Sequence, residues 1–579
     1  MNGHRSLTTA AALVAVFLTA AAPAATITVN STADTAADDG NCTLREALAA
    51  ATTNTASGAM PGECAAGEPL PVVDTIAFAI PGSGVHTIQP TSVIPRIEES
   101  VVIDGYTQPG SAPNTLAIGD DAILLIEIDG SLMPVGNDLF DFPNNGSTIR
   151  GLVINRMQGT SIYCGASTFS SSDNVIEGSF FATDAAGTAF LGFNYTSVRV
   201  DGANNRIGGT APASRNVFAG TGGSKTGTVM IQGPDNVVQG NYIGVDATGT
   251  VALPSNATTN GLEIGLTGAA TNTQIGGDVA GAGNVIFNSN VSINLNDNGS
   301  SGATIQGNHI GVNAAGDAVL GVGVLGIEAS DMPDVTIGGS TSGAGNVMAG
   351  FNTVISIGNG TNVTVQGNHI GTDASGTRPL SNYGNGILVG RTGVGSIIGG
   401  TDPGEGNTIA YSCGQGILFS GADHWPILGN SIFANHGLGI ALSSPDVPTQ
   451  NDDGDGDTGN NDQQNYPVIT SATISNGTAS ISGTLNSAAA TTFRIEFFAN
   501  AACNRSGYGA GETLIGTIDV ATDADGNASF GPLSFAAPDG ADITATATDP
   551  DGNTSEFSAC VGPHNHIFTS RFDGACVDG

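Results

Sequence analysis

The amino-acid sequence predicts an all-β protein in which a right-handed parallel β-helix precedes a β-sandwich. Three observations predict this class. The 579 residues include 86 glycines but only 5% aromatic residues, as expected for many short strands joined by tight turns. Two short phrases alternate along the chain with a period of about 30 residues, which is typical of stacked repeats. After residue 465, longer alternating segments separated by turn residues replace these phrases, as in a sandwich.

Residues 1–24 are predicted to be a signal peptide. Arg5 supplies positive charge, residues 7–22 are apolar, and Ala22-Pro23-Ala24 is an A-x-A cleavage site. No later segment is apolar for long enough to span a bilayer. We therefore expect a secreted or cell-surface protein, without a membrane span after the signal peptide is removed.

Residues 25–73 are predicted to form an N-terminal cap. The only convincing helical pattern before the repeats is Leu44–Ala51. An uncovered end of a β-helix would be a sheet edge with unpaired backbone groups. A helix at this place in the chain could cover that edge.

Residues 74–445 are predicted to be the β-helix. One phrase reads Gln-Gly-Asn-x-Ile in its three central copies, Glu-Gly-Ser-Phe-Phe in the first and Leu-Gly-Asn-Ser-Ile in the last. Its glycines lie 60 to 67 residues apart, at Gly178, Gly240, Gly307, Gly367 and Gly429. The second phrase, Ile-Gly-Gly followed by Asn-Val or Asn-Thr, falls between the copies of the first. Each unit of about 30 residues therefore forms one coil, and the two phrases mark alternate coils.

Each coil contains short runs in which apolar and polar residues alternate, such as Val291–Leu295, so one face is buried. Three strands per coil, turned by glycine and asparagine, give a β-helix. Asparagines that recur at one coil position are expected to stack into a hydrogen-bonded ladder. A β-propeller is the alternative, but it needs about four strands per blade and usually aromatic signatures.

Residues 446–465 are predicted to be an acidic linker. Its carboxylates alternate with glycines, and such oxygen-rich segments suit calcium, which takes six to eight oxygen ligands. The candidate ligands are Asp452, Asp453, Asp455 and Asp457. The alternative is a solvated acidic hinge without a metal, and no glutamate stands at the spacing of an EF-hand.

Residues 466–562 are predicted to be the β-sandwich, and residues 563–579 a C-terminal tail without an assigned mechanism. Strands are expected at residues 479–483, 493–498, 513–520 and 543–548. Turn residues separate them, notably Asp525-Gly526-Asn527, and short strands at this spacing are typical of a sandwich.

The seven cysteines of an exported chain favour disulfides. Cys42 and Cys64 lie close together near the mature N-terminus, and Cys503 and Cys560 lie in one domain, so we expect these two pairs. The others are Cys164, Cys413 and Cys576. The odd number leaves at least one cysteine unpaired or bonded to another molecule.

The segment Cys42–Leu48 resembles the C-S-L-R-E-A motif of many bacterial exported β-helix proteins, with Thr43 in the serine position. Residues 74–78 and 103–110 are also similar to that family. The resemblance implies a pectin-lyase-like fold for the repeats, and residues 466–562 resemble bacterial immunoglobulin-like modules. Because one fold can serve many functions, the resemblance is specific for architecture and not for activity.

The formal net charge of −37 restricts the partners. Nucleic acid is excluded, because phosphate binding needs a basic surface. Polyanionic glycans would be repelled unless a cation or an arginine cluster intervened. An extracellular polysaccharide or cell-surface glycan that is neutral or bridged by calcium fits better.

Candidate catalytic residues are few. His424 and His436 fall on neighbouring final coils and could face each other, although a structural role for each is favoured. Arg199, Arg206 and Arg215 lie within 17 residues and could form a groove for an acidic sugar. Surface ion pairs, each worth little, are the favoured interpretation of these arginines.

One column of residues is a candidate ligand-binding surface. Phe180, Tyr242, His309 and His369 hold the same position in successive copies and each precede an inward apolar residue. Alternation along a strand then predicts that they point outward, roughly 10 Å apart on every second coil. They could stack on sugar rings. The favoured alternative is a stack that only stabilises the sheet, and the Asp-rich segments that follow are explained by Asx turns.

Two classes of function remain. In the first, the protein is a non-catalytic surface protein whose β-helix is a stiff spacer or glycan-binding face. In the second, it is a polysaccharide lyase, hydrolase or epimerase. The first is favoured, because no converging catalytic set stands out and basic residues are scarce.

Overall fold

The computed structural model describes residues 24–165, 171–192, 196–220, 227–253, 262–297, 299–391, 393–443, 447–562 and 576. The predicted signal peptide lies outside the described residues except for Ala24. The predicted C-terminal tail also lies outside them, except for Cys576. Helix α1 (Leu44–Thr53) is the sole α-helix of the described part, and at ten residues it is too short to cross a bilayer.

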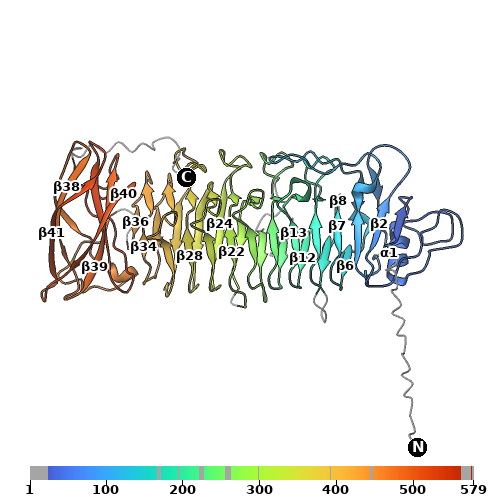
Figure 1. The fold of residues 1–579 in the computed structure, drawn as a ribbon, viewed down its shortest axis with the longest axis horizontal. Coiled ribbons are helices and arrows are strands. Elements are labelled where there is room, and N and C mark those ends of the chain that lie inside the picture. Colours follow the sequence, from blue (N-terminus) through green and yellow to red (C-terminus); the bar gives the residue numbers. More distant parts are fainter. Residues whose placement is uncertain are drawn as a thin grey trace, which may run out of the picture.

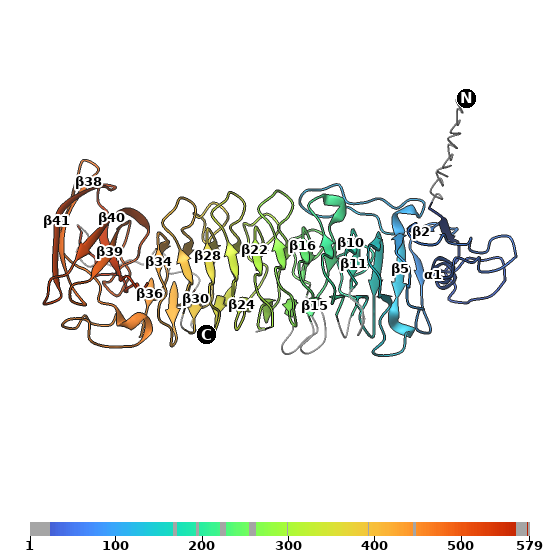
Figure 2. The ribbon, with the colours of Figure 1, turned by 60° about the horizontal axis from the view of Figure 1, so that its bottom comes forward.

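The described chain forms an elongated rod, with α1 near one end and the C-terminal strands at the other (Figure 1). Three parallel sheets of 13, 12 and 11 strands run along the rod, and Figure 2 shows them from a second side. From β4 (Val101–Asp104) on, each coil contributes one strand to each sheet in turn. The predicted parallel β-helix is therefore confirmed.

The first sheet consists of β1 (Thr26–Val29), β2 (Asp74–Phe78), β4 (Val101–Asp104), β7 (Thr148–Arg150), β10 (Val175–Glu177), β13 (Arg206–Gly208), β16 (Val237–Gln239), β19 (Gln274–Gly276), β22 (Thr304–Gln306), β25 (Thr336–Gly338), β28 (Thr364–Gln366), β31 (Ile397–Gly399) and β34 (Ile427–Leu428). The second sheet consists of β3 (His86–Ile88), β5 (Ile126–Asp129), β8 (Leu152–Asn155), β11 (Phe180–Phe181), β14 (Val217–Phe218), β17 (Tyr242–Ile243), β20 (Val285–Ile286), β23 (His309–Ile310), β26 (Val347–Met348), β29 (His369–Ile370), β32 (Thr408–Ala410) and β35 (Ser431–Phe433). The third sheet consists of β6 (Phe140–Phe142), β9 (Ile162–Cys164), β12 (Val198–Val200), β15 (Gly227–Ile231), β18 (Leu262–Leu266), β21 (Val291–Asn294), β24 (Gly323–Ala329), β27 (Phe351–Ile357), β30 (Asn385–Val389), β33 (Ile417–Phe419) and β36 (Ile440–Ala441).

The interior of the rod is a stack of aliphatic side chains. In the first sheet, Ile149, Ile176 and Ile207 occupy one register column, and the next coils continue it with Val238 and Ile275. All five are buried. Each such residue contributes about 1.5–3 kcal/mol by leaving water, and this column explains why one apolar residue recurs in every coil.

The predicted asparagine ladder is confirmed at the corner between the first and second sheets. Each Nδ2 donates to the Oδ1 of the asparagine on the next coil, over 2.9 to 3.0 Å. The ladder runs through Asn216, Asn241, Asn284, Asn308, Asn346, Asn368, Asn407 and Asn430. The same Oδ1 atoms accept backbone N–H groups at the turns. The two phrases of the sequence thus place an asparagine at one corner of eight successive coils.

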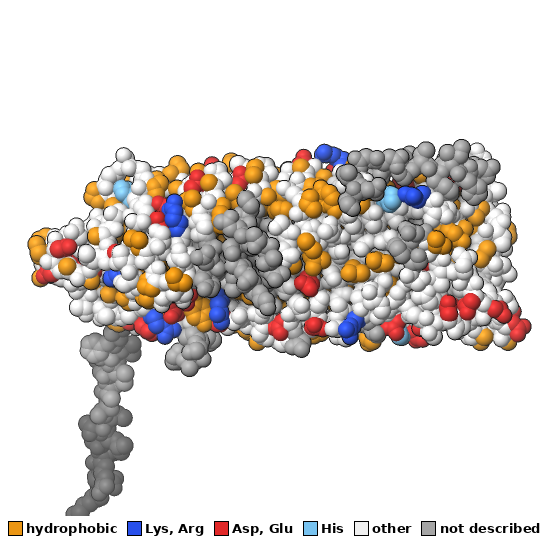
Figure 3. Space-filling model, turned by 180° about the vertical axis from the view of Figure 1, so that it is seen from behind, with side chains coloured by type: hydrophobic (Ala, Val, Ile, Leu, Met, Phe, Trp, Pro, Cys, Tyr) orange, Lys and Arg blue, Asp and Glu red, His pale blue; other side chains and the backbone are white. Residues whose placement is uncertain are grey.

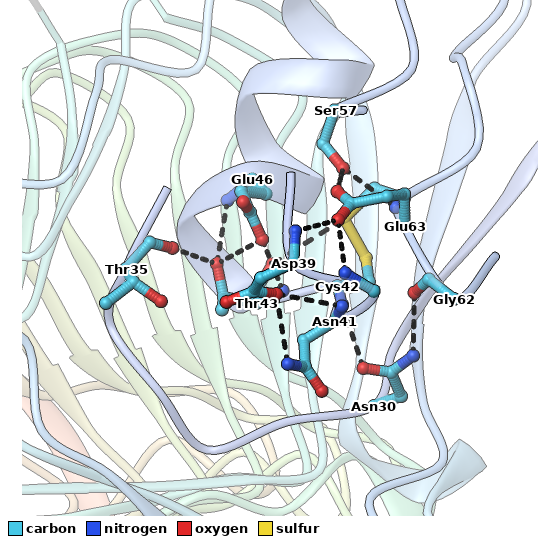
Figure 4. Close-up of a disulfide and its surroundings, with 12 residues drawn as sticks. Asn30, Thr35, Asp39, Asn41, Cys42, Thr43, Glu46, Ser57, Gly62 and Glu63 are labelled. Carbon is cyan, nitrogen blue, oxygen red and sulfur yellow. Dashed lines mark hydrogen bonds between the residues drawn. A yellow bond between two sulfur atoms is a disulfide. The ribbon is translucent and has the colours of Figure 1, made fainter. Parts of the chain in front are cut away.

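The predicted N-terminal helix is confirmed. Thr43 and Glu46 form a capping box, in which the Thr43 Oγ1 accepts the Glu46 N–H and a Glu46 oxygen accepts the Thr43 N–H. The helix ends at Thr53 because Asn54 adopts a left-handed conformation. Figure 4 shows the Cys42–Cys64 disulfide beside this cap, with Glu63 accepting several N–H groups nearby. Strand β1 pairs with β2, so the segment before α1 also supplies the first strand of the first sheet.

The C-terminal strands form two three-stranded antiparallel sheets. One contains β37 (Val468–Ser475), β38 (Thr478–Asn486) and β41 (Asn527–Ala536). The other contains β40 (Thr513–Ala521), β39 (Thr492–Asn500) and β42 (Asp542–Thr548). Side chains of both sheets, including Ile481, Phe497 and Ile543, share one buried core, so the four predicted strands are confirmed. The likeness to immunoglobulin modules stays a prediction.

The C-terminal sheets cover the last coil of the rod. Ile432 and Gly511 exchange two backbone hydrogen bonds, and Phe498 and Phe557 belong to the same buried core as the coils. Glu496 and Glu556 are buried at this junction, where their carboxylates accept N–H groups of the last coils and the following segment. The segment before β37 is fixed too, since the buried Asn461 donates to the carbonyls of Trp425 and Thr554.

The two predicted disulfides, Cys42–Cys64 and Cys503–Cys560, are confirmed. A third joins Cys413 to Cys576 across 163 residues. The remaining cysteine, Cys164, is buried without a disulfide, which accounts for the odd number.

Candidate functional site

The column of Phe180, Tyr242, His309 and His369 exists, but it does not form an exposed ladder. The four residues share one register position of the second sheet, on every second coil. However, Phe180 is 1% exposed and Tyr242 is 3% exposed. The prediction of an outward-facing surface is therefore wrong for these two residues, and the two histidines are half-buried.

The cover over this column is the Asp-rich turn of each copy. A short antiparallel bridge, such as Val245 with Ala252, folds the turn back over the ring. Asp246 Oδ1 holds the turn by accepting the N–H groups of Thr250 and Val251, and Gly249 lies against the Tyr242 ring. Side-chain capping thus explains this motif, as predicted, and also accounts for the burial that alternation alone does not foresee.

The three candidate arginines lie on different parts of the rod. Arg199 is on β12 of the third sheet, where it pairs with Asp201 and lies over the Tyr163 ring. Arg206 is on β13 of the first sheet and pairs with Glu177. Arg215 is buried at the corner between the first and second sheets. The favoured ion pairs are confirmed for Arg199 and Arg206. The alternative of a common groove is wrong, because the chain passes from the third sheet through the first sheet to the next corner within these 17 residues. On the face drawn in Figure 3, the basic side chains likewise form no continuous patch.

The two candidate histidines lie at different corners. His424 follows β33 and precedes β34, so it lies between the third and first sheets, next to Asp423 and Asn553. His436 lies between the second and third sheets, where its Nε2 is 2.7 Å from Arg505 Nη1. The prediction that the two histidines could face each other is therefore wrong.

Three of the four linker carboxylates come together. One oxygen each of Asp452, Asp455 and Asp457 lies within 4.8 Å of the others, whereas Asp453 is not part of this group. Burial raises the pKa of Asp455 to about 6. Its oxygens accept hydrogen bonds from Asn465 N–H and the Ser487 hydroxyl. Calcium binding by this group stays a prediction.

A hairpin that the sequence does not predict lies along the rod. Residues 112–123, here called the strap, are closed by the Ala112–Ile123 bridge. The strap extends from the early coils over later ones (Figure 1, blue loop along the top of the rod). Asn114 Nδ2 donates to the Pro212 carbonyl over 3.0 Å, and the Tyr242 hydroxyl accepts the N–H of Gly119 over 2.8 Å.

Arg215 fixes the tip of the strap. Its guanidinium donates to the carbonyls of Leu116, Ala117 and Gly119, and it lies 4.5 Å from the centroid of the Tyr242 ring. These contacts join residues about 100 positions apart in the sequence. Local sequence patterns do not predict contacts of this kind. They explain why an arginine is buried here.

Arg215 belongs to a row of equivalent loops, here called the corner loops, at residues 209–215, 277–283, 339–345 and 400–406. Each joins a first-sheet strand to a second-sheet strand on alternate coils. The loops rest on the intervening coils through bonds such as Gly240 N–H to the Ala282 carbonyl. The last position of the loop is arginine in the first and glycine in the other three. A side chain in place of Gly283 would collide with the Gly307 carbonyl.

A groove lies between the strap tip and the second and third corner loops. Its volume is about 450 Å³, within the range of small-molecule sites. This corner groove is lined by Ala117, Ile118, Arg215, Tyr242, residues 277–281 and 283–285, Gly307, His309, Ala314, Ser342 and Gly343. Two members of the predicted ligand-binding column, Tyr242 and His309, therefore lie in its wall.

A second, smaller cavity of about 100 Å³ lies where the last coil meets the C-terminal sheets. His436, Arg505 and Glu512 line it together with Tyr411 and Phe433. This brings a histidine, an arginine and a carboxylate together. The sequence does not predict this, because Arg505 and Glu512 belong to a different domain from His436.

A scan against protein-family models finds no match, and a search of curated proteins finds none either. Among solved structures, the chain is similar to the A-module of the Azotobacter vinelandii mannuronan C-5 epimerase AlgE4. The identity is 11% and the TM-score 0.22, and the match covers 65% of this chain and 90% of that one. A similarity of this size supports no inference about activity.

Proposed function

We propose that the protein is an exported, non-catalytic surface protein, in which the β-helix is a stiff spacer that presents a carbohydrate-binding face. The observation that carries this proposal is the uninterrupted stack of coils, covered at one end by the capped helix and at the other by the C-terminal sheets. A rod of this kind can hold a binding face at a fixed distance from its attachment point. The C-terminal sheets serve as the attachment module.

The engagement of the candidate catalytic residues supports a non-catalytic role. Arg199 and Arg206 each form a salt bridge with a carboxylate of the same chain. Arg215 donates hydrogen bonds to the strap. General acid–base catalysis needs its groups within hydrogen-bond reach of one reacting bond. Arginines that lie on the third sheet, on the first sheet and at a corner of the coil do not meet that requirement.

Three disulfides support export, because disulfides persist in oxidising compartments. The net charge of −37 favours a neutral or calcium-bridged polysaccharide over a polyanion.

The test is incubation of the purified mature protein with a panel of neutral and acidic polysaccharides, with calcium or with a chelator. We expect retention on one or more of the glycans without release of reducing or unsaturated ends. Turnover of a polysaccharide would overturn the non-catalytic proposal, and absence of binding to every glycan would overturn the carbohydrate-binding part.

A second candidate function is a polysaccharide lyase, hydrolase or epimerase, and the cavity with His436, Arg505 and Glu512 favours it. These side chains supply a base, a cation for a carboxylate and an acid within one cavity. If turnover is found, Arg505→Ala and His436→Ala should each abolish it. Arg199→Ala, which lies on the third sheet, serves as the control.

A further inference from the structure

We propose that the corner groove binds a neutral, hydroxyl-rich saccharide chain, with Asp278 as its main polar anchor. This inference rests on the proposed carbohydrate-binding function and assigns that function to one place on the rod. The corner groove takes the place of the predicted ligand-binding column as the candidate sugar-binding surface, because that column does not form an exposed ladder.

The charges in the groove favour a neutral ligand. Arg215 is the cation in its wall, and three strap carbonyls and the Tyr242 ring already engage it. Asp278 is an exposed carboxylate, and one of its oxygens accepts the Thr341 hydroxyl. Its remaining acceptor capacity suits the hydroxyl groups of a sugar. An anionic sugar would instead meet a like charge.

The histidine in the wall adds no positive charge to the groove. His309 Nδ1 lies 3.1 Å from the Asn313 carbonyl, so Nδ1 carries the proton and Nε2 keeps its lone pair. Burial lowers the pKa of His309, which keeps the ring neutral at pH 7. The acceptor that the groove offers to a donor-rich ligand is therefore the Asp278 carboxylate.

The shape of the groove also fits a sugar. A Cβ at Gly281 would lie 2.2 Å from the Thr210 carbonyl, and a Cβ at Gly343 would lie 2.5 Å from the Asp278 carbonyl. The corner loops therefore require glycine here, because each loop packs closely against the backbone of the loop before it. Ile118 and Val279, each 59% exposed, line the groove as well. They offer apolar contact to the C–H faces of a sugar ring.

The test uses two variants of the second corner loop, each with a matched control on the fourth. Ala280→Trp fills the groove, and Pro403→Trp places the same side chain at the equivalent exposed position outside it. Asp278→Asn removes the anchor charge, and Asp402→Asn removes an exposed charge of the fourth loop. Titration calorimetry of the full mature protein would use a neutral β-glucan hexasaccharide and a hexasaccharide of uronic acids.

We expect the neutral hexasaccharide to bind about tenfold or more tightly than the uronate. Ala280→Trp should weaken its binding about tenfold or more, Asp278→Asn several-fold, and the two controls should leave it unchanged. If the neutral hexasaccharide binds Ala280→Trp as tightly as the wild-type protein, the corner groove is not the binding site, but the proposed carbohydrate-binding function stands. Tighter binding of the uronate would overturn the ligand class. If neither ligand binds, the groove proposal fails. If the wild-type protein also binds no glycan of the larger panel, the proposed carbohydrate-binding function is overturned as well.

Discussion

At the scale of single residues, buried carboxylates hold the rod and the C-terminal sheets together. Glu556 is 2% exposed, and its two oxygens accept the N–H groups of Leu442 and Thr449 at 2.9 and 2.6 Å. Burial raises its pKa to about 7, and burial also raises the pKa of Glu496. The junction therefore contains acids that bind their protons more tightly when folded.

This predicts that acid stabilises the junction. The folded pKa of Glu556 lies above the unfolded value of about 4.3. Its contribution to stability is therefore full below that value and is lost as the pH rises through about 7. The loss is on the order of 3 kcal/mol. In thermal unfolding experiments, the Tm should fall as the pH rises from 5 to 8. The slope of Tm against pH should be smaller in Glu556→Gln than in the wild-type protein. Equal slopes in the two proteins would contradict the prediction, and Glu512→Gln serves as the control.

At the scale of elements, the asparagine ladder joins the coils as a polar column beside the aliphatic one. Asn308 accepts from Asn284 and donates to Asn346 and to the carbonyls of Ile275 and Gln306. Its two neighbours in the ladder, Asn284 and Asn346, are buried. Removing the Asn308 side chain would leave several buried polar groups without a hydrogen-bond partner.

We predict that Asn308→Ala lowers the free energy of unfolding by about 3 kcal/mol or more, since each unsatisfied buried group costs about 1–3 kcal/mol. Urea denaturation measures this. Asn359→Ala, an exposed asparagine of the same rod, should change the free energy by less than about 0.5 kcal/mol. A similarly small change in Asn308→Ala would show that the ladder is not a major source of stability.

The linker carboxylates give a prediction at the same scale. If Asp452, Asp455 and Asp457 bind calcium, the cation stabilises the folded linker by mass action. The Tm should then rise when calcium replaces a chelator, and the rise should disappear in Asp452→Asn but persist in Asp551→Asn. The same Tm in calcium and in chelator would contradict the calcium prediction.

Most of the strands and the helix are predictable from the sequence. The features that the sequence does not predict share one cause, which is contact between distant segments. The periodic Ile and Asn positions fix the coil, and Thr43 with Glu46 fixes the start of the helix, because both are local patterns. The strap is missed because Arg215 contacts Leu116 across 99 residues. The burial of Phe180 and Tyr242 is missed because alternation predicts a direction, whereas the turn that folds over each ring decides exposure.

At the scale of the whole molecule, both ends of the rod are covered. The aromatic contact between Phe557 and Phe498, with ring centroids 5.4 Å apart, lies where the C-terminal sheets meet the last coil. Phe557 also packs against Gly439 of that coil. Without this cover, the last strands of three sheets would present unpaired edges.

We predict that Phe557→Asp separates the C-terminal sheets from the rod, because a buried charge without a partner costs several kcal/mol. The uncovered coil should then associate with other copies, and size-exclusion chromatography with light scattering should detect oligomers. Leu514→Asp, at a residue 38% exposed, should remain in the wild-type state. A Phe557→Asp protein with an unchanged molar mass would contradict the prediction.

The strap has a consequence for the order of assembly. Gly119 can meet the Tyr242 hydroxyl only after the coil that carries Tyr242 has been laid down, 123 residues later in synthesis. Pro212 and Arg215, which also bind the strap, follow their partners by 96 to 99 residues, so residues 112–123 lack these contacts while the intervening coils form. Later coils thus fix a hairpin of the early coils, so a chain interrupted before Pro212 should carry a loose hairpin that proteases can cut.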